Sequence, residues 1–195
     1  FSSSVRIDSA SVRLNNSKSI QGALTVVNGS ILRFGANNGL TLGGSITLTA
    51  SRLGTDSTNA LAVTGSGTIS GSILFDNGSG ASVLGSLSMQ RMAANLTLAS
   101  NLRLTGSLVL GRGNVVVPSG QVLTLAGTAD TALSGGSLGS FVVGSVARVL
   151  PSNLTPADTR FWLYPVGKGV QYLPALVQGA TTGSVSPTLS IEAFN

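Results

Sequence analysis

A short alternation of apolar and small polar residues recurs along most of the chain and constrains its fold more than any other feature. It occurs as "LTV" at 24–26, "LTL" at 40–42 and "LRL" at 102–104. An alternation with a period of two places Leu, Val and Ile on one face of a β-strand and Thr, Ser and Arg on the other. In one stretch, successive units begin at residues 96, 102, 108, 115 and 123.

The connections between these units are as short as the units themselves. They are rich in Gly, Asn and Ser, as in "NG" at 28–29 and "ANNG" at 36–39, and these residues tolerate the positive φ that sharp corners require. Strands of about three or four residues with a turn roughly every 6–8 residues are shorter than those typical of a sandwich. The pattern therefore predicts an all-β parallel β-helix, or β-solenoid, with a β-sandwich or jelly roll as the alternative.

The expected dimensions follow from this pattern. Three sides of about seven residues make a coil of roughly 20 residues, so residues 1–147 form about seven coils. At about 4.8 Å per coil, they stack into a rod of roughly 35 Å. We find no stretch with the periodicity of an amphipathic helix, and we expect the segment 86–98 to form a strand, a corner or one helical turn.

The composition changes after residue 150. Five of the six prolines and five of the nine aromatic residues follow it, and "RFWLYPVGKGVQYLPALV" at 160–177 contains the only tryptophan. Proline cannot donate a hydrogen bond to an interior ladder, so it belongs at edges and turns. We therefore expect residues 1–147 to form the solenoid and residues 148–195 to form a C-terminal cap or a small antiparallel β module.

The residue types present exclude several kinds of chemistry. The chain has no His and no Cys, which excludes Ser-His-Asp and Cys-His catalysis and removes the commonest zinc ligands. Only six acidic residues are present, and the spacing of Asp56 and Asp76 corresponds to about one coil, which could make them neighbours. A carbohydrate-active β-helix enzyme is therefore an alternative, but both residues lie in sequences typical of turns. We expect no enzyme activity, no catalytic residue, no metal site and no cofactor.

The charge distribution and the hydropathy indicate which classes of partner the chain can bind. The formal net charge is +5, and the eleven basic residues are spread thinly without interleaved aromatic residues. This distribution does not predict nucleic-acid binding, and it is compatible with a weak attraction to acidic glycans or cell surfaces. No apolar run approaches the length that a membrane-spanning helix needs, so we predict no membrane span.

The segment "SFVVGSVARVLP" followed by "YPVGKGVQYLPALV", after a long series of "LTL" units, resembles the passenger region of secreted or cell-surface proteins of the Bacteroidota. Many of those proteins are cargo of the type IX secretion system and contain a similar "PVG…Y.P" segment. The resemblance covers most of the chain, is most specific at 141–177 and implies a secreted, extracellular or cell-surface β-rich structural or adhesive module. It supplies no catalytic residues. Because the chain opens on Phe1, we expect a processed product or a fragment.

These observations lead to a hypothesis of an extracellular structural protein, adhesin or self-assembling filament subunit. Unpaired strand edges at the ends of a solenoid favour head-to-tail self-association, and the N-terminal strand bearing Phe1, Val5 and Ile7 could be donated to a neighbouring subunit. The alternative is a glycan-binding surface module with a cell-surface or glycan partner. Its predicted stacking or interface residues are Phe161, Trp162, Tyr164 and Tyr172.

Overall fold

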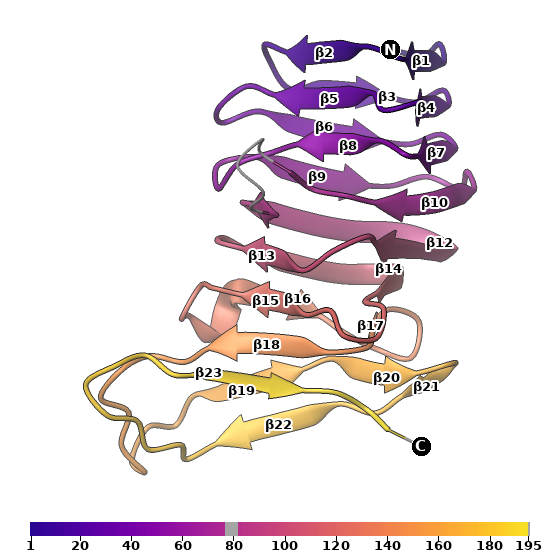
Figure 1. The fold of residues 1–195 in the computed structure, drawn as a ribbon. Coiled ribbons are helices and arrows are strands. Elements are labelled where there is room, and N and C mark those ends of the chain that lie inside the picture. The colour runs from indigo at the N-terminus through magenta and orange to yellow at the C-terminus, as the bar shows by residue number, and fades with distance from the viewer. Residues whose placement is uncertain (77–81, 195) are drawn as a thin grey trace.

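The computed structural model describes residues 1–76 and 82–194, which form a right-handed parallel β-helix of about seven turns (Figure 1). From the N-terminus, the chain crosses the near side of Figure 1 from right to left, returns behind from left to right, and descends. This is the usual hand of a crossover between parallel strands. The predicted parallel β-helix is confirmed, and the parallel pairing of successive coils excludes the alternative sandwich.

Each coil contributes to each of three faces, and strands of successive coils pair in parallel. On the second face this pairing is divided into two separate sheets, one in the first three coils and one in the later coils. Strands β12 (Ser86–Leu98) and β14 (Leu108–Val116) turn the corner from the third face to the first. The first face contains β1 (Val5–Asp8), β4 (Leu24–Val27), β7 (Ile46–Thr49), β10 (Ile69–Ile73), β17 (Val142–Val143) and β20 (Val166–Lys168). The second face contains β2 (Ser11–Leu14), β5 (Ile31–Phe34), β8 (Arg52–Gly54), β11 (Val83–Leu84), β13 (Leu102–Leu104), β15 (Leu123–Leu125) and β18 (Val146–Val149). The third face contains β3 (Lys18–Ile20), β6 (Gly39–Leu42), β9 (Ala60–Val63), β12 (Ser86–Leu98), β14 (Leu108–Val116) and β16 (Leu133–Gly135).

The core consists of ladders in which equivalent inward side chains stack from coil to coil. In such a ladder the side chains above and below are at the strand spacing of about 4.8 Å, so residues of similar size pack in continuous contact. The alternation seen in the sequence fills these ladders with aliphatic side chains. One ladder on the third face runs through Leu40, Leu61, Leu87, Leu108 and Leu133.

The coils are less uniform than the sequence suggests. Val5 pairs with Leu24, which gives a coil close to the expected length, whereas Val115 pairs with Val142, which gives a coil several residues longer. The segment 86–98 is the long strand β12, whose register with β14 shifts between Met89 and Asn95. The one helical element among the described residues is the 3-10 turn η1 (Asp130–Ala132).

Asn and Gly occupy the corners, as predicted, because several corners need a left-handed backbone. Asn28 and Gly29 have φ values of 57° and 74°, and Asn37 has a φ of 59°. At Gly44 the reason is close packing instead, since an added Cβ would collide with the backbone carbonyl of Gly22 in the preceding coil. The corner sequences are therefore fixed by both backbone conformation and the stacking of coils.

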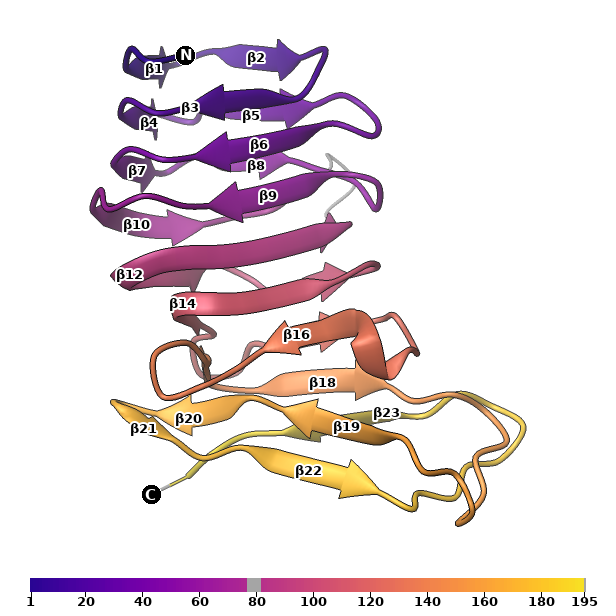
Figure 2. The ribbon, with the colours of Figure 1, turned by 180° about the vertical axis from the view of Figure 1, so that it is seen from behind.

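At the C-terminal end the pairing changes from parallel to antiparallel on every face (Figure 2). The parallel ladder continues as far as β20, which pairs with β17. The expected boundary at 147/148 lies within β18. Each of three strands then accepts an antiparallel neighbour. These pairs are β20 with β21 (Gln171–Tyr172), β19 (Phe161–Tyr164) with β22 (Ala175–Gln178), and β18 with β23 (Thr188–Ile191).

The part of the chain that the structure describes contains no helix long and apolar enough to cross a membrane.

Candidate functional site

The aromatic residues of β19 do not form the predicted platform for sugars. Trp162 and Tyr164 point into the core and are completely buried, and only Phe161, on the opposite face of the strand, is 56% exposed. The prediction was wrong for Trp162 and Tyr164 because alternation along β19 directs them inward, over the end of the apolar core. There the Tyr164 hydroxyl donates to the carbonyl of Leu189 on β23, at 3.3 Å.

Tyr172 does not combine with Phe161 into an exposed surface. Its half-buried ring packs on Phe141, with ring centroids 5.8 Å apart and an angle of 36° between the planes. A sugar-stacking platform needs exposed ring faces. The rings of Tyr172 and Phe141 instead cover part of each other's surface. Of the four predicted residues, the structure leaves only Phe161 well exposed.

The predicted donated strand is used within its own chain. Strand β1 pairs in parallel with β4, with Val5 opposite Leu24 and Ile7 opposite Val26, and Ile7 is buried. Phe1 is 63% exposed and lies beside the ammonium group of Lys18, which is 5.9 Å from the ring centroid. The donated-strand prediction does not fit this structure, because Ile7 already completes an inward ladder of the first face.

The acidic side chains form local structural contacts. Asp8 accepts from Asn28 and Arg6, and these contacts lower the pKa of its carboxyl group. Asp76 pairs with Arg52 at 3.0 Å, and Asp158 with Arg160 at 2.6 Å. Within the described ranges, no three acidic residues gather as metal ligands. These contacts are those of turns and surface ion pairs.

Arg91 is a fully buried cation that the sequence reasoning missed. It extends from β12 beneath the corners of the two preceding coils, and it donates to the carbonyl oxygens of Thr64 at 2.7 Å, Gly67 at 2.9 Å and Leu42 at 2.9 Å. Burial lowers the pKa of its guanidinium group. The sequence contained the information needed to predict this burial, because Leu87, Met89 and Arg91 occupy alternate positions on the inward face of β12.

Arg148 is the second fully buried cation. It donates to the carbonyl oxygens of Leu163 at 3.1 Å, Ala129 at 3.0 Å and Asp130 at 3.2 Å. Burial lowers the pKa of this guanidinium group, while the nearby Tyr164 and Asp130 act in the opposite direction. Arg148 thus connects the last parallel coil to η1 and to β19.

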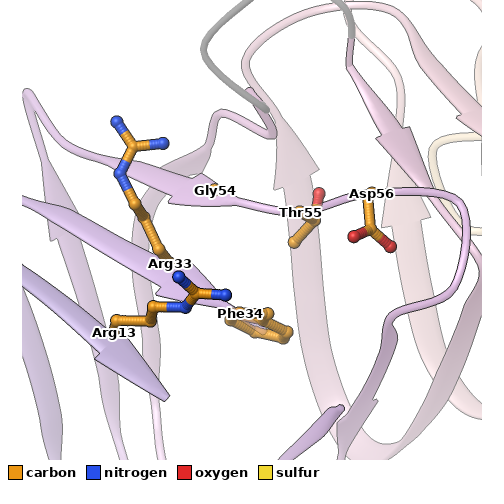
Figure 3. A pocket seen from close by; sticks show the side chains of 6 residues that line it. All are labelled: Arg13, Arg33, Phe34, Gly54, Thr55 and Asp56. Atoms are coloured by element: carbon orange, nitrogen blue, oxygen red, sulfur yellow. The ribbon is translucent and has the colours of Figure 1, made fainter. Parts of the chain in front are cut away.

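A shallow pocket with a volume of about 230 Å³ lies on the second face (Figure 3). Arg13 on β2, Arg33 on β5 and Gly54 on β8 are directly in register, so two outward arginines stand above a glycine. The largely buried Phe34 also lines the pocket, and Asp56 follows the end of β8. The pocket is lined by Arg13, Arg33, Phe34, Gly54, Thr55 and Asp56.

Asp56 is held in place at one side of this pocket. Its Oδ1 accepts from the backbone N–H of Thr58 at 2.7 Å and from the Thr58 hydroxyl at 2.6 Å. The same hydroxyl accepts from the backbone N–H of Asn37 in the preceding coil, at 2.8 Å. The hydrogen bonds within the described chain leave Oδ2 of Asp56 without a donor, so one carboxylate oxygen remains to accept a hydrogen bond from a ligand.

The two arginines also retain their binding capacity. Neither Arg13 nor Arg33 forms an ion pair or a side-chain hydrogen bond with any described residue, whereas Arg6, Arg52 and Arg160 each have a carboxylate partner. The stem of Arg33 lies across Gly54, and a Cβ added at Gly54 would be 2.9 Å from Cγ of Arg33. The pocket therefore presents two positively charged donor groups and one acceptor.

Comparison of the chain with protein-family models, with curated proteins and with solved structures finds no match in any of the three.

Proposed function

We propose that this chain is a structural, adhesin-like segment of an extracellular protein, in which the β-helix is a rigid support for a binding surface. One observation carries this proposal: six buried polar or charged side chains of the described chain each donate to a backbone carbonyl, and among the side-chain donor groups of its buried residues only the indole N–H of Trp162 and Nε of Arg148 lack a described partner. These buried polar groups therefore stabilise the β-helix itself, because a buried polar group needs a hydrogen-bond partner within the protein. The six side chains are those of Ser30, Thr55, Asn59, Arg91, Ser140 and Arg148.

The arrangement of carboxylates favours binding over catalysis. Hydrolysis of a glycosidic bond ordinarily uses two carboxyl groups that flank one substrate. Among the residues that the structure describes, one carboxylate, that of Asp56, lines the pocket on the second face. A surface of this kind can hold a polymer but lacks the second carboxyl group for acid and base catalysis.

Retention and turnover on polysaccharides test this proposal together. The purified chain should be retained on at least one immobilised acidic polysaccharide, and it should release no new reducing ends or unsaturated products. Product formation that disappears in Asp56→Asn would contradict the proposal and favour a carbohydrate-active enzyme. An absence of retention on every polysaccharide and cell surface tried would contradict the adhesin-like role.

Head-to-tail self-association is the second candidate. In the described chain, β1, β2 and β3 each pair on one side only, and Phe1 and Val12 near this end are 63% and 39% exposed. Unpaired strand edges favour pairing with another chain. Sedimentation should then show larger species as the concentration rises, and a monomer at all concentrations would argue against filaments.

An extracellular location belongs to the same proposal. It rests on the resemblance of residues 141–177 to secreted proteins of the Bacteroidota. Antibody labelling of intact source cells should detect the chain without permeabilisation. Labelling only after permeabilisation would contradict it.

A further inference from the structure

The pocket on the second face has the donors and the acceptor required for one particular class of sugar. We propose that Arg13, Arg33 and Asp56 bind a uronic-acid residue of an acidic polysaccharide, with its carboxylate on the arginines and a ring hydroxyl on Asp56. This inference rests on the proposed adhesin-like function and names the ligand of its binding surface.

The arginine pair calls for an anion. Arg13 and Arg33 are Cα partners in adjacent parallel strands, so their side chains leave the sheet about 4.8 Å apart. Like charges directly opposite on a sheet are destabilising, and no described carboxylate pairs with either of them. A bound carboxylate offsets this repulsion and matches the planar guanidinium group, which donates two parallel hydrogen bonds.

The size and shape of the pocket suit one unit of a polymer. Its volume of about 230 Å³ is below the roughly 300–1,000 Å³ of clefts that enclose whole small ligands. Gly54 keeps the third position of the column flat, since it has no side chain beside Arg33. One sugar of a chain can therefore occupy the pocket beside Arg33 while its neighbours lie along the surface.

Asp56 distinguishes a uronate from other anions. Because Thr58 fixes this carboxylate at the side of the pocket, a phosphate or a sulfate on the arginines would be close to a negative charge without offering it a hydrogen. A uronic-acid residue carries its carboxylate and several hydroxyl groups on one ring. One hydroxyl can donate to Oδ2 of Asp56 while the carboxylate accepts from Arg13 and Arg33.

The test measures binding of polygalacturonate oligomers to the whole chain by calorimetry, with amylose and dextran sulfate as comparison polymers. The double variant Arg13→Met with Arg33→Met should bind polygalacturonate about tenfold more weakly or worse, because it loses charge-assisted hydrogen bonds. The matched control is Arg103→Met with Arg112→Met. It removes the same charge from two exposed arginines elsewhere and should change the affinity less than about twofold.

Asp56→Asn separates a uronate from other anions. It should leave polygalacturonate binding within a few-fold and strengthen dextran sulfate binding, because a negative charge beside the pocket is removed. Arg33→Lys should weaken polygalacturonate binding, since an ammonium group cannot form the bidentate pair. All of these residues are at least partly exposed, so circular dichroism should show an unchanged fold.

The outcomes that overturn the proposal differ from those that overturn the proposed function. Equal losses in the two double variants would show nonspecific attraction and remove the site, while an adhesin-like role would stand. Tighter wild-type binding to dextran sulfate than to polygalacturonate would identify a sulfate site instead. Binding of amylose with equal affinity would show that the carboxylate is not recognised. No retention of the wild type on any polysaccharide or cell surface would contradict the adhesin-like function itself.

Discussion

Arg148 lies in register with Leu125, so a guanidinium group occupies the position that leucine fills in the preceding coils of the second face. Both side chains are completely buried. A lone cation is costly in an apolar core unless its donors are satisfied. Here three carbonyl oxygens accept from the two terminal nitrogens of Arg148, while its Nε has no partner among the described residues. The residue therefore joins the end of the parallel stack to the antiparallel strands that close it.

Replacing Arg148 by Met should destabilise the protein although the new side chain is apolar. Three part-buried carbonyl groups would lose their donors, and each unsatisfied group costs up to about 1–3 kcal/mol, partly offset because a charge is no longer buried. We expect the free energy of unfolding in urea to fall by roughly 2–4 kcal/mol. Exposed Arg112→Met is the control and should change it by less than about 0.5 kcal/mol. An equal effect of both variants would show that the carbonyl contacts contribute nothing.

Arg91 should be equally sensitive to the shape of its head group. Lysine keeps the charge but is a compact ammonium group that cannot satisfy three carbonyls in the geometry of a guanidinium fork. We expect Arg91→Lys to lower the free energy of unfolding by about 1–3 kcal/mol. Hydrogen exchange should accelerate first at the corner 64–68, whose carbonyls it binds. Acceleration spread evenly over the chain would argue against this local role.

The alternation in the sequence was sufficient to predict the coil and its inward aliphatic ladders, because a period of two defines which side chains are buried. The same alternation places Arg91 and Arg148 inward, yet charge alone suggested that all arginines were on the surface. Only the three-dimensional stacking shows which carbonyl oxygens are near enough to satisfy them. The inward direction of Trp162 and Tyr164 could likewise have been predicted from the alternation "FWLY".

The pocket could not be predicted in the same way. Arg13 and Arg33 lie one coil apart, and their register depends on coil lengths that vary along the chain. A change of one residue in a corner would have directed one of the two side chains into the core. The sequence spacing therefore permits many stacked pairs, and the corner conformations select this one.

Gly44→Ala should test how closely the coils approach at the corner before β7. The added Cβ would collide with the carbonyl of Gly22, and backbone cannot move aside as a flexible side chain can. We expect a loss of about 1–3 kcal/mol or more in the free energy of unfolding, measured in urea. Gly183→Ala is the matched control, because nothing lies within 4 Å of its added Cβ. Equal stabilities of the two variants would show that the coils can separate at this corner without cost.

The pKa of Tyr164 should report whether the C-terminal strands keep water away from the end of the core. Burial raises its pKa from the ordinary 10.0 to about 12, and burial also raises the pKa of Tyr172. Because the folded-state pKa is above the unfolded one, the stabilisation is fully present below pH 10 and is lost as the pH rises toward 12. Phenolate absorbance measured against pH should show Tyr164 titrating last, and Tyr164→Phe should remove that step.

The same variant separates this effect from general alkaline unfolding. The free energy of unfolding of Tyr164→Phe should be lower at neutral pH, because the hydrogen bond to Leu189 is lost. It should also fall less steeply than that of the wild type between pH 10 and pH 12. If both tyrosines of the native wild type titrate together near their ordinary pKa, water reaches Tyr164, and strands β22 and β23 do not close the end of the core as the structure indicates.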